Sequence, residues 1–377
     1  ELLYAKDKPL AIKGVSLTDH LFEKVAEKDF LLYAPYHSFS YIIKFLRQAA
    51  LDPQVKTIKI TIYRLAKVSH IASSLINAAK NGKEVIVQIE LQARFDEASN
   101  MEYAQKMQDE GVKLIFGVKG LKVHSKVCLV ERLENKKIKL YGFISTGNFN
   151  NVTAKIYTDY TLFTANQQIL KDLRKVFNFL KTNYVVNKYK HLLVSPHYAK
   201  NGFLKLIDKE ISKAENGQPA QIKLKLNSIT SYKMVDKLYE ASNAGVQIKM
   251  IIRGICCLIP GVEGLSENIE AISIVDKYLE HPRMLIFGVE GEECVYISSS
   301  DWMTRNLDNR VEVTCPIYDE DIKKELIDTF SICWNDNVKA RVFSKNQDNA
   351  YRKTEGLPIR SQLKTYEYYV NKITVVE

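Results

Sequence analysis

The sequence predicts an α/β fold of two duplicated domains, each with a mostly parallel mixed sheet flanked by helices. Three observations support this prediction. Apolar runs of strand length alternate with amphipathic runs of helix length along the chain. The order of strands and helices before about residue 190 is repeated after it. Each half has one histidine at the start of a strand and a basic residue two positions later: His124 with Lys126, and His281 with Arg283.

The first half holds a regular series of predicted strands and helices. The strands are short apolar or alternating runs, and the helices have apolar residues at helical spacing. We expect strands at 31–39 (ending in a proline turn), 56–64, 84–91, 112–117, 138–145 and 157–164, and another that carries His124. We expect helices near 19–27, up to residue 50, from about 70 to 81, up to 111 and over 166–182.

Residues 184–200 are expected to be a connector, and the second half then repeats the pattern. The expected elements are a helix over 202–215, a strand over 220–226, a helix ending at Ala244-Gly245 and a strand over 246–254. Gly82 and Gly245, which both fit a helix end, are 163 positions apart, and His124 and His281 are 157 positions apart. Because these separations are similar, we interpret the chain as an internal duplication with one histidine per half.

These patterns divide the chain into four parts. Residues 1–30 are expected to be a lead-in, 31–190 the first domain, 191–345 the second domain and 346–377 a C-terminal tail. The tail is rich in Lys, Tyr and Gln, and its pattern fits either a strand or an arm on a partner subunit. The chain begins at Glu1 without Met, so we expect it to be the C-terminal part of a longer protein.

The composition is that of a basic globular protein. Of the 377 residues, 54 are Lys or Arg and 44 are Asp or Glu, which gives a formal net charge of +10. This excess suits an anionic partner such as nucleic acid, an acidic membrane surface, a nucleotide or another polyphosphate. A generally basic surface that favours solubility explains the same excess, so charge alone does not choose a function.

The cysteines and the apolar runs predict a cytoplasmic protein. Six cysteines occur without a Cys-x-x-Cys spacing and mostly in apolar runs, as buried free thiols do, and Cys256 and Cys257 are expected in the core. No apolar run reaches the roughly 18 residues that a membrane span needs, and no signal peptide is visible. We therefore expect a reducing compartment, no transmembrane segment, and at most a peripheral association with a membrane.

Residues 117–130, GVKGLKVHSKVCLV, are the stretch best suited to chemistry. A basic loop with two glycines runs into a strand on which His124 and Lys126 share one face, because side chains alternate along a strand. Neutral imidazole is a nucleophile at physiological pH, and a nearby cation stabilises phosphoryl oxygens. Arg64 and Arg94 are expected at carboxyl ends of strands, where functional residues gather in α/β sheets. A single strand histidine is more often structural, so the duplicated histidine strengthens the functional interpretation.

The usual nucleotide-binding loops are absent from the sequence. There is no G-x-x-x-x-G-K-[ST] motif and no G-x-G-x-x-G motif, and we interpret Gly82-Lys83 as a helix C-cap. A bound nucleotide would therefore be held without a glycine-rich cradle.

Two His-x-basic strands on a duplicated α/β scaffold resemble the phospholipase D superfamily. That superfamily pairs two His-x-Lys motifs, in which one histidine forms a phosphohistidine and the other acts as general acid and base. This sequence departs from the diesterase pattern. Glu131 stands where an Asp is expected, Arg283 replaces the second Lys, and TGN and SSD replace G-S-x-N.

The departures match one branch, because the sequence closely resembles polyphosphate kinase of the first family. The resemblance starts at about residue 30 and covers the two C-terminal catalytic domains of that family, without its amino-terminal helical domain and its head domain. The motifs that carry it are APYHSF (34–39), TIYRLA (61–66), LQARFDE (91–97), GLKVHSK (120–126), STGNFN (145–150), YTDY (157–160), RGICCL (253–258), YLEHPRM (278–284) and SSSDWMTRNLDNRVE (298–312).

The resemblance implies a reversible reaction in which the terminal phosphate of ATP is added to inorganic polyphosphate, with Mg²⁺. By position, His124 matches the autophosphorylated histidine of the family. Tyr157, Arg253 and His281 match residues that bind ATP, and His281 is also expected to give general acid or base help.

Arg64 and Arg94 match positions that the family associates with the metal. Arginine has no lone pair to offer Mg²⁺ and stays protonated in proteins. We therefore interpret the two side chains as holding phosphate oxygens that the metal also binds.

Further roles follow from the same resemblance. Asp159 and Glu131 are both candidates for fixing the tautomer of His124, and Lys122 and Lys126 are candidate polyphosphate contacts. The resemblance also implies ATP, ADP and polyphosphate as partners, a homo-oligomer, and no nucleic acid.

Two other functions compete with this one. A phospholipase D-like phosphodiesterase acting on nucleic acid or phospholipid would share the fold and the nucleophile, but it hands the phosphoryl group to water or an alcohol. The altered second motif and the additional arginines disfavour it. A non-enzymatic module that binds polyanions is the third alternative, and the presence of both histidines argues against it.

Overall fold

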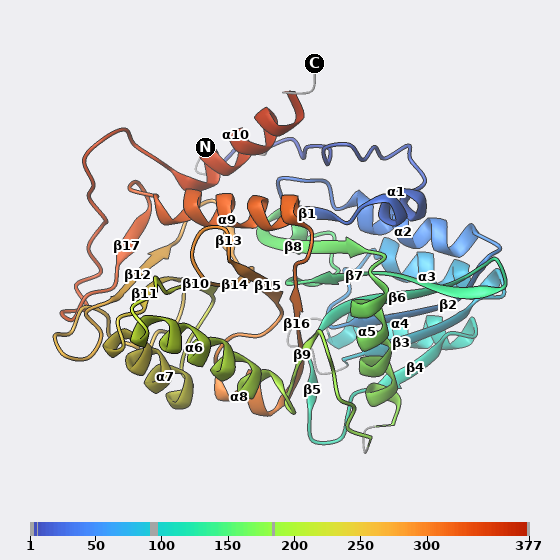
Figure 1. The fold of residues 1–377 in the computed structure, drawn as a ribbon. Coiled ribbons are helices and arrows are strands. Elements are labelled where there is room, and N and C mark those ends of the chain that lie inside the picture. Colours follow the sequence, from blue (N-terminus) through green and yellow to red (C-terminus); the bar gives the residue numbers. More distant parts are fainter. Residues whose placement is uncertain (1–3, 6, 91–96, 183–184, 375–377) are drawn as a thin grey trace. The chain divides into compact units, whose positions relative to one another are not determined.

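The chain divides into two compact units, each with its own sheet (Figure 1). The computed structural model describes residues 4–5, 7–90, 97–182 and 185–374. The N-terminal unit comprises Lys6–Val194, and the C-terminal unit comprises Ser195–Glu377 with Glu1–Ala5. Within the described ranges, no helix is both long enough and apolar enough to cross a membrane.

The N-terminal unit is built on a sheet with the strand order β1-β8-β7-β6-β2-β3-β4. Its strands are β1 (Phe30–Ala34), β2 (Val55–Ile62), β3 (Glu84–Ile89), β4 (Lys113–Phe116), β6 (Lys126–Glu134), β7 (Lys137–Ser145) and β8 (Tyr157–Thr164), and the short strand β5 (Lys122–Val123) precedes β6. Its helices are α1 (Leu21–Glu27), α2 (Ser40–Leu51), α3 (His70–Lys80), α4 (Glu97–Asp109), the 3-10 turn η1 (Thr153–Lys155) and α5 (Gln167–Lys181). Residues of α2, α3 and α4 share one core with β2 and β3, and α5 packs against β6 and β7.

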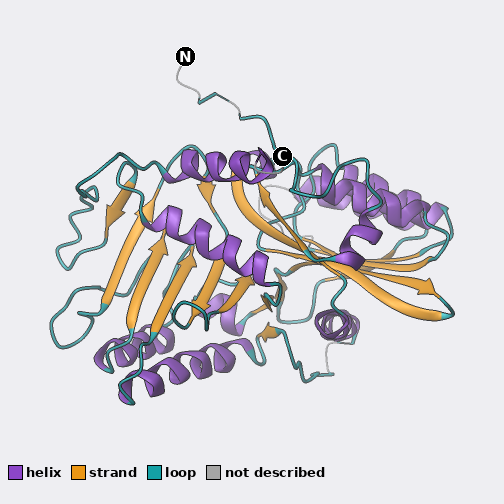
Figure 2. Ribbon diagram, turned by 45° about the horizontal axis from the view of Figure 1, so that its top comes forward, coloured by secondary structure: helices purple, strands orange, loops and turns teal. Residues whose placement is uncertain are grey.

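The C-terminal unit has a sheet with the strand order β17-β12-β11-β10-β14-β15-β16. Its strands are β10 (Gln221–Leu226), β11 (Gln247–Ile252), β12 (Ile269–Ile274), β13 (Leu279–Glu280), β14 (Arg283–Phe287), β15 (Cys294–Ser298), β16 (Arg310–Pro316) and β17 (Ala340–Val342). The short strand β9 (Leu193–Ser195) precedes them and contains the boundary between the two units in the sequence. Its helices are α6 (Ala199–Glu215), α7 (Tyr232–Asn243), α8 (Thr304–Asp308), α9 (Glu320–Trp334) and α10 (Ser361–Thr374). Figure 2 shows α6 and α7 along one face of this sheet and α9 along the other.

The two sheets repeat one strand order, which confirms the predicted duplication. The order β8-β7-β6-β2-β3-β4 of the N-terminal unit corresponds to β16-β15-β14-β10-β11-β12 of the C-terminal unit. The helix α3 joins β2 to β3, as α7 joins β10 to β11. Each predicted histidine motif therefore occupies an equivalent place, between the helical crossovers and the hairpin that follows.

Parallel pairing is confined to three strands of each sheet, so the sheets are mixed but less parallel than predicted. β2, β3 and β4 pair in parallel, as do β10, β11 and β12. The other neighbours in the two strand orders given above are antiparallel. Connection length is the reason: the two residues Asn135 and Lys136, with φ of 49° and 64°, join β6 to β7 in a type I′ turn, which joins only antiparallel strands.

Gly82 and Gly245 end equivalent helices in the same way. Their φ values of 76° and 97° lie in the region that glycine adopts without strain. In both places the glycine N–H donates to the carbonyl three positions back at 2.9 Å, and the next N–H, of Lys83 or Val246, donates to the carbonyl five positions back at 3.0 Å. These are Schellman caps, so the prediction that Gly82-Lys83 ends a helix is confirmed.

The tail contains a helix, α10, that packs against α9. The hydroxyl of Tyr369 donates to Oε1 of Glu325 at 2.8 Å, and the ammonium of Lys372 contacts the same carboxylate. The sequence left a strand and an arm open for this region. Its β-branched and aromatic residues favour a strand by propensity, and burial of one face against α9 overrides that local preference.

All six cysteines are free thiols, and their burial differs from the prediction at one position. Cys257 is exposed and Cys256 is half-buried, so the prediction that both lie in the core is wrong for Cys257. The chain leaves β11 before these residues and forms an irregular surface loop, in which Ile255 is 60% exposed.

Candidate active site

Each predicted catalytic histidine lies in a two-residue break between two strands, just before the strand that it was predicted to open. His124 and Ser125 separate β5 from β6, and His281 and Pro282 separate β13 from β14. Pro282 has no N–H to give to a ladder. At the other break the side chain of Thr61 replaces a backbone partner: its hydroxyl donates to the carbonyl of Ser125 at 2.7 Å and accepts from the Val127 N–H at 3.1 Å.

In the N-terminal unit, the ring of Tyr63 lies at the centre of the histidine cluster. The His124 ring meets it edge to face, with centroids 5.2 Å apart and an interplanar angle of 83°. The ammonium groups of Lys122 and Lys126 each lie 5.4 Å from the Tyr63 centroid, and the guanidinium carbon of Arg64 lies 5.8 Å from it. Three cations thus lie near one aromatic ring beside an imidazole, which is a suitable environment for a phosphoryl group.

Lys126 is a buried member of this cluster. The residue is 1% exposed, and its ammonium group donates to the backbone carbonyl of His124. Desolvation of a charged group is costly unless polar partners surround it. The lysine therefore fixes the backbone of the histidine while keeping its charge near the imidazole.

The loop after β7 is shaped by a hydroxyl–carboxylate pair. Thr146 Oγ1 donates to Asp159 Oδ1 at 2.7 Å and accepts from the Tyr160 N–H at 3.0 Å. A Cβ atom on Gly147 would lie 1.9 Å from Asp159 Oδ2, so the TGN motif needs glycine for space. Tyr157, matched to ATP binding, is the first residue of the same strand as Asp159.

Glu131 does not fit the role of fixing the tautomer of His124, for which the sequence left Glu131 and Asp159 open. Its carboxylate Oε1 pairs with Lys59 at 3.1 Å and with Arg174 at 3.2 Å. It lies five residues along β6 from Lys126, about 16 Å at the usual strand rise. Glu131 is therefore a structural ion-pair residue, and Asp159 is the remaining candidate for orienting His124.

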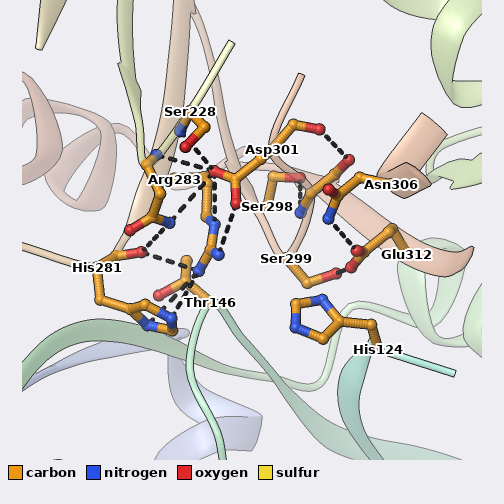
Figure 3. Close-up of polar contacts among 12 residues, drawn as sticks. His124, Thr146, Ser228, His281, Arg283, Ser298, Ser299, Asp301, Asn306 and Glu312 are labelled. Atoms are coloured by element: carbon orange, nitrogen blue, oxygen red, sulfur yellow. Dashed lines mark hydrogen bonds and ion pairs between the residues drawn. The ribbon is translucent and has the colours of Figure 1, made fainter. Parts of the chain in front are cut away.

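In the C-terminal unit, Arg283 joins His281 to a buried carboxylate (Figure 3). Its Nη1 lies 3.2 Å from Nε2 of His281 and donates to the His281 carbonyl at 2.9 Å. Its Nε and Nη2 donate to the two oxygens of Asp301 at 3.2 and 3.0 Å, a bidentate pair. His281 itself is 9% exposed. The guanidinium that replaces the second-motif lysine thus has a fixed partner and a fixed orientation toward the imidazole.

Asp301 stays ionised because its partners outweigh its burial. Burial alone would raise its pKa, but the charge and hydrogen bonds of Arg283, with the backbone N–H of Asn227 at 2.8 Å, hold the pKa far below its usual range. Asn227 also donates from Nδ2 to the carbonyl of His281 at 3.2 Å, and its Oδ1 accepts from Nε of Arg253. One asparagine therefore links a predicted ATP ligand to a predicted catalytic residue.

We call the residues around His124 and those around His281 the two half-sites. They share a further pattern, which strengthens the case for equivalent roles. At the carboxyl ends of β7 and β15, the last residue of the strand hydrogen-bonds through its hydroxyl to another hydroxyl. The residue after it hydrogen-bonds through its hydroxyl to a carboxylate. The pairs are Ser145 with Thr161 (2.8 Å), Thr146 with Asp159 (2.7 Å), Ser298 with Thr314 (2.6 Å) and Ser299 with Glu312.

The structure groups most of the predicted site residues. His124 and Arg64 meet at Tyr63, and His281 and Arg253 meet at Asn227. The position of Arg94 lies outside the described residues. Sequence reasoning missed Tyr63 and Asn227, although each directly follows the carboxyl end of a strand, β2 or β10, where functional residues gather.

The hydrogen-bond donors of the predicted site residues suit phosphate better than a metal ion. Among the described residues, no group of three or more His, Cys, Asp or Glu side chains could hold a metal. Arg64 has only N–H donors to offer. A Mg²⁺ ion in proteins commonly keeps waters and binds substrate phosphates with one or two carboxylates. The residues present therefore fit a metal that is carried by a nucleotide.

Comparison with known proteins first defines the class of fold. The phosphatidylserine synthase of Haemophilus influenzae Rd KW20 superposes with a TM-score of 0.56 at 11% identity, over 93% of this chain and 95% of that one. The two repeated sheets, with one histidine motif each, make this a protein of duplicated phospholipase D-like domains.

Closer relatives then define the family. The models of polyphosphate kinase C-terminal domain 1 and domain 2 match residues 20–186 and 192–362. The chain belongs to the polyphosphate kinase family. Polyphosphate kinases of Vibrio vulnificus (strain YJ016) and Escherichia coli (strain K12) are 46% and 47% identical to it over 96% and 92% of its length, and 52% and 51% of theirs.

A solved structure agrees with this assignment. The polyphosphate kinase of Porphyromonas gingivalis superposes with a TM-score of 0.91 at 37% identity, over 99% of this chain and 57% of that one. The chain thus spans about half the length of the curated relatives that it matches.

Proposed function

We propose that this chain forms the catalytic part of a polyphosphate kinase, which reversibly transfers the terminal phosphate of ATP to inorganic polyphosphate. The observation that carries the proposal is the His124 cluster, in which an imidazole lies beside an aromatic ring surrounded by three cations. Membership of the polyphosphate kinase family supports the choice of substrates.

The proposed mechanism has two displacements. A ring nitrogen of His124 attacks the γ-phosphorus of ATP in line, the bond to the bridging oxygen breaks, and ADP leaves. A terminal oxygen of polyphosphate then attacks the phosphorus of phospho-His124, the N–P bond breaks, and the imidazole is regenerated. Both steps run in reverse when polyphosphate and ADP are supplied.

The basic residues would stabilise charge on the transferred group. Arg64, Lys122 and Lys126 surround the Tyr63 ring next to the nucleophile and are placed to hold phosphoryl oxygens. Mg²⁺ would enter with ATP and neutralise its phosphates. Arg94 is assigned to the same phosphates on sequence similarity alone.

The C-terminal half-site supplies nucleotide contacts and proton transfer in this proposal. His281 would act as general acid or base, with Arg283 beside its ring. Arg253 and Tyr157 are each assigned to ATP on sequence similarity. The six free thiols fit a reducing cytoplasm as the place of the reaction.

A labelling experiment tests the proposal. The full-length protein, as its cell makes it, is incubated with γ-³²P-ATP and Mg²⁺. We expect label that is stable in alkali and labile in acid, and we expect none in the His124→Ala variant. Labelled wild-type protein should then pass the label to polyphosphate.

The rival phosphodiesterase predicts a different outcome. Absence of label in wild-type protein, with hydrolysis of a DNA or phospholipid diester, would overturn the kinase proposal. The His281→Ala variant gives a second control. Loss of a general acid or base should slow the transfer but leave the label on His124.

A further inference from the structure

Gln362, the second residue of α10, contacts the short strand that precedes His281. Its Nε2 donates to the carbonyl of Tyr278 at 2.8 Å, and its Oε1 accepts from the Tyr278 N–H at 2.9 Å. The side-chain amide thus occupies both backbone groups of one residue, as a neighbouring strand would. Nε2 also donates to Oε1 of Glu280 at 2.7 Å. Gln362 is 3% exposed, so these contacts are shielded from water.

Glu280, the residue directly before His281, is held from a second side. Its Oε2 pairs with the ammonium of Lys225 at 2.7 Å, and the two side chains are 3% and 2% exposed. A buried ion pair of this kind is costly to disturb, because either charge would be left without compensation. The carboxylate is therefore fixed between Lys225 of β10 and Gln362 of α10.

The start of α10 is itself anchored near this strand. Arg360 donates to both oxygens of Asp276 at 2.7 and 2.5 Å, and the side chain of Asp276 is fully buried. The N–H of Ser361 donates to Oδ2 of Asp336 at 2.7 Å. Asp276 lies two residues before Tyr278. Residues 360–362 therefore hold the segment before His281 at two neighbouring points, Asp276 and Tyr278.

We propose that residues 360–362 form a positioning clasp for His281, with Gln362 as its central positioning residue. Arg283 restrains the histidine from the side of β14, and Gln362 restrains the backbone on the side of β13. The clasp rests on the proposed function, in which His281 takes part in phosphoryl transfer. Small displacements of a catalytic group cost large factors in rate, so loss of the clasp should lower turnover more than substrate affinity.

The Gln362→Met variant tests the clasp, with Lys364→Met as its matched control. Methionine has nearly the shape of glutamine but cannot make the three hydrogen bonds. Lys364 lies on the same helix, is 50% exposed at its side chain, and pairs with Glu367 one turn further on. We expect kcat to fall on the order of tenfold in Gln362→Met with a smaller change in KM for ATP, and neither to change in the control.

A spectroscopic measurement separates this proposal from the proposed function. In protein labelled at the histidine ring carbons, we expect the His281 resonance and its pH titration to change in Gln362→Met and to stay unchanged in Lys364→Met. This holds even if the wild-type protein shows no kinase activity, a result that would contradict the function and leave the clasp standing. A folded Gln362→Met protein with the wild-type His281 resonance and wild-type kcat would overturn the clasp.

A second variant covers the case in which Gln362→Met fails to fold. The milder Gln362→Asn variant keeps an amide on α10 and leaves the pair of Glu280 with Lys225 in place, but its shorter side chain draws the amide back from Tyr278 and Glu280. We expect a lower kcat and a changed His281 resonance in this variant as well. A folded Gln362→Asn protein with the wild-type kcat and the wild-type His281 resonance would overturn the clasp.

Discussion

Three charged side chains at the two half-sites are held almost without contact with water. Lys126, Arg283 and Asp301 are 1%, 4% and 6% exposed, and each has a polar partner on a neighbouring backbone or side chain. Such groups remain charged only while those partners stay in place. The geometry that would serve catalysis therefore also contributes to the stability of each unit.

Asp301 provides a prediction at the scale of a single residue. Its replacement in Asp301→Asn removes the carboxylate that pairs with the buried guanidinium of Arg283, and we expect the free energy of unfolding to fall by about 3–5 kcal/mol. Urea denaturation at pH 7 measures this loss. The control is Asp308→Asn, because Asp308 pairs with Lys200 at a side chain that is 36% exposed, and we expect a change within about 1 kcal/mol.

The same pair predicts a dependence of stability on pH. The folded state holds the pKa of Asp301 below its ordinary value near 4, because Arg283 and backbone N–H groups outweigh the effect of burial. The stabilisation is thus complete above about pH 4 and is lost as the pH falls toward the folded-state pKa. Wild-type protein should lose stability between about pH 4 and 2 more steeply than Asp301→Asn. Parallel curves would show that Asp301 is not the titrating group.

At the scale of elements, the break before β6 depends on one threonine. The β2–β6 ladder pairs Ile60 with Cys128. One position further, the hydroxyl of Thr61 makes the hydrogen bonds to the backbone of Ser125 and Val127. The break turns the chain so that His124 can meet the ring of Tyr63. The geometry of the His124 cluster therefore follows from a local irregularity of the sheet.

The Thr61→Val variant tests this dependence. Valine keeps the shape but leaves the carbonyl of Ser125 and the N–H of Val127 without their partner, so we expect a loss of about 2–4 kcal/mol in unfolding free energy. We also expect less phosphohistidine from γ-³²P-ATP. The control is Thr57→Val on the same strand, whose hydroxyl makes one long contact of 3.4 Å to Glu84. Equal effects of the two variants would contradict a special role for Thr61.

The elements also show what the sequence could and could not predict. The caps at Gly82 and Gly245 and the crossover helices depend on residues close together in the chain, and these predictions hold. The cluster around Tyr63 depends on the approach of two segments about 60 residues apart, for which no local signal exists. Similarly, α10 is a helix because of its contact with α9, against the strand propensity of its own residues.

For the molecule as a whole, the net charge of +10 has a specific consequence if polyphosphate is the substrate. A linear polyanion releases condensed counterions when lysine and arginine side chains neutralise its phosphates. Binding should therefore weaken with salt along a straight line in a plot of log Kd against log salt concentration. A small anion such as a single phosphate should show a much weaker dependence.

Lys122→Met tests whether the His124 cluster is part of this polyanion contact. If Lys122 neutralises one phosphate, its removal should reduce the slope of log Kd against log salt by about 0.7, the value for single-stranded nucleic acid. Fluorescence titration of the full-length protein with labelled polyphosphate at several salt concentrations measures the slope. Lys324→Met is the control, because Lys324 is 76% exposed on α9 and pairs with Asp328. Its slope should equal that of wild-type protein, whereas an unchanged slope in Lys122→Met would place the polyphosphate contact elsewhere on the chain.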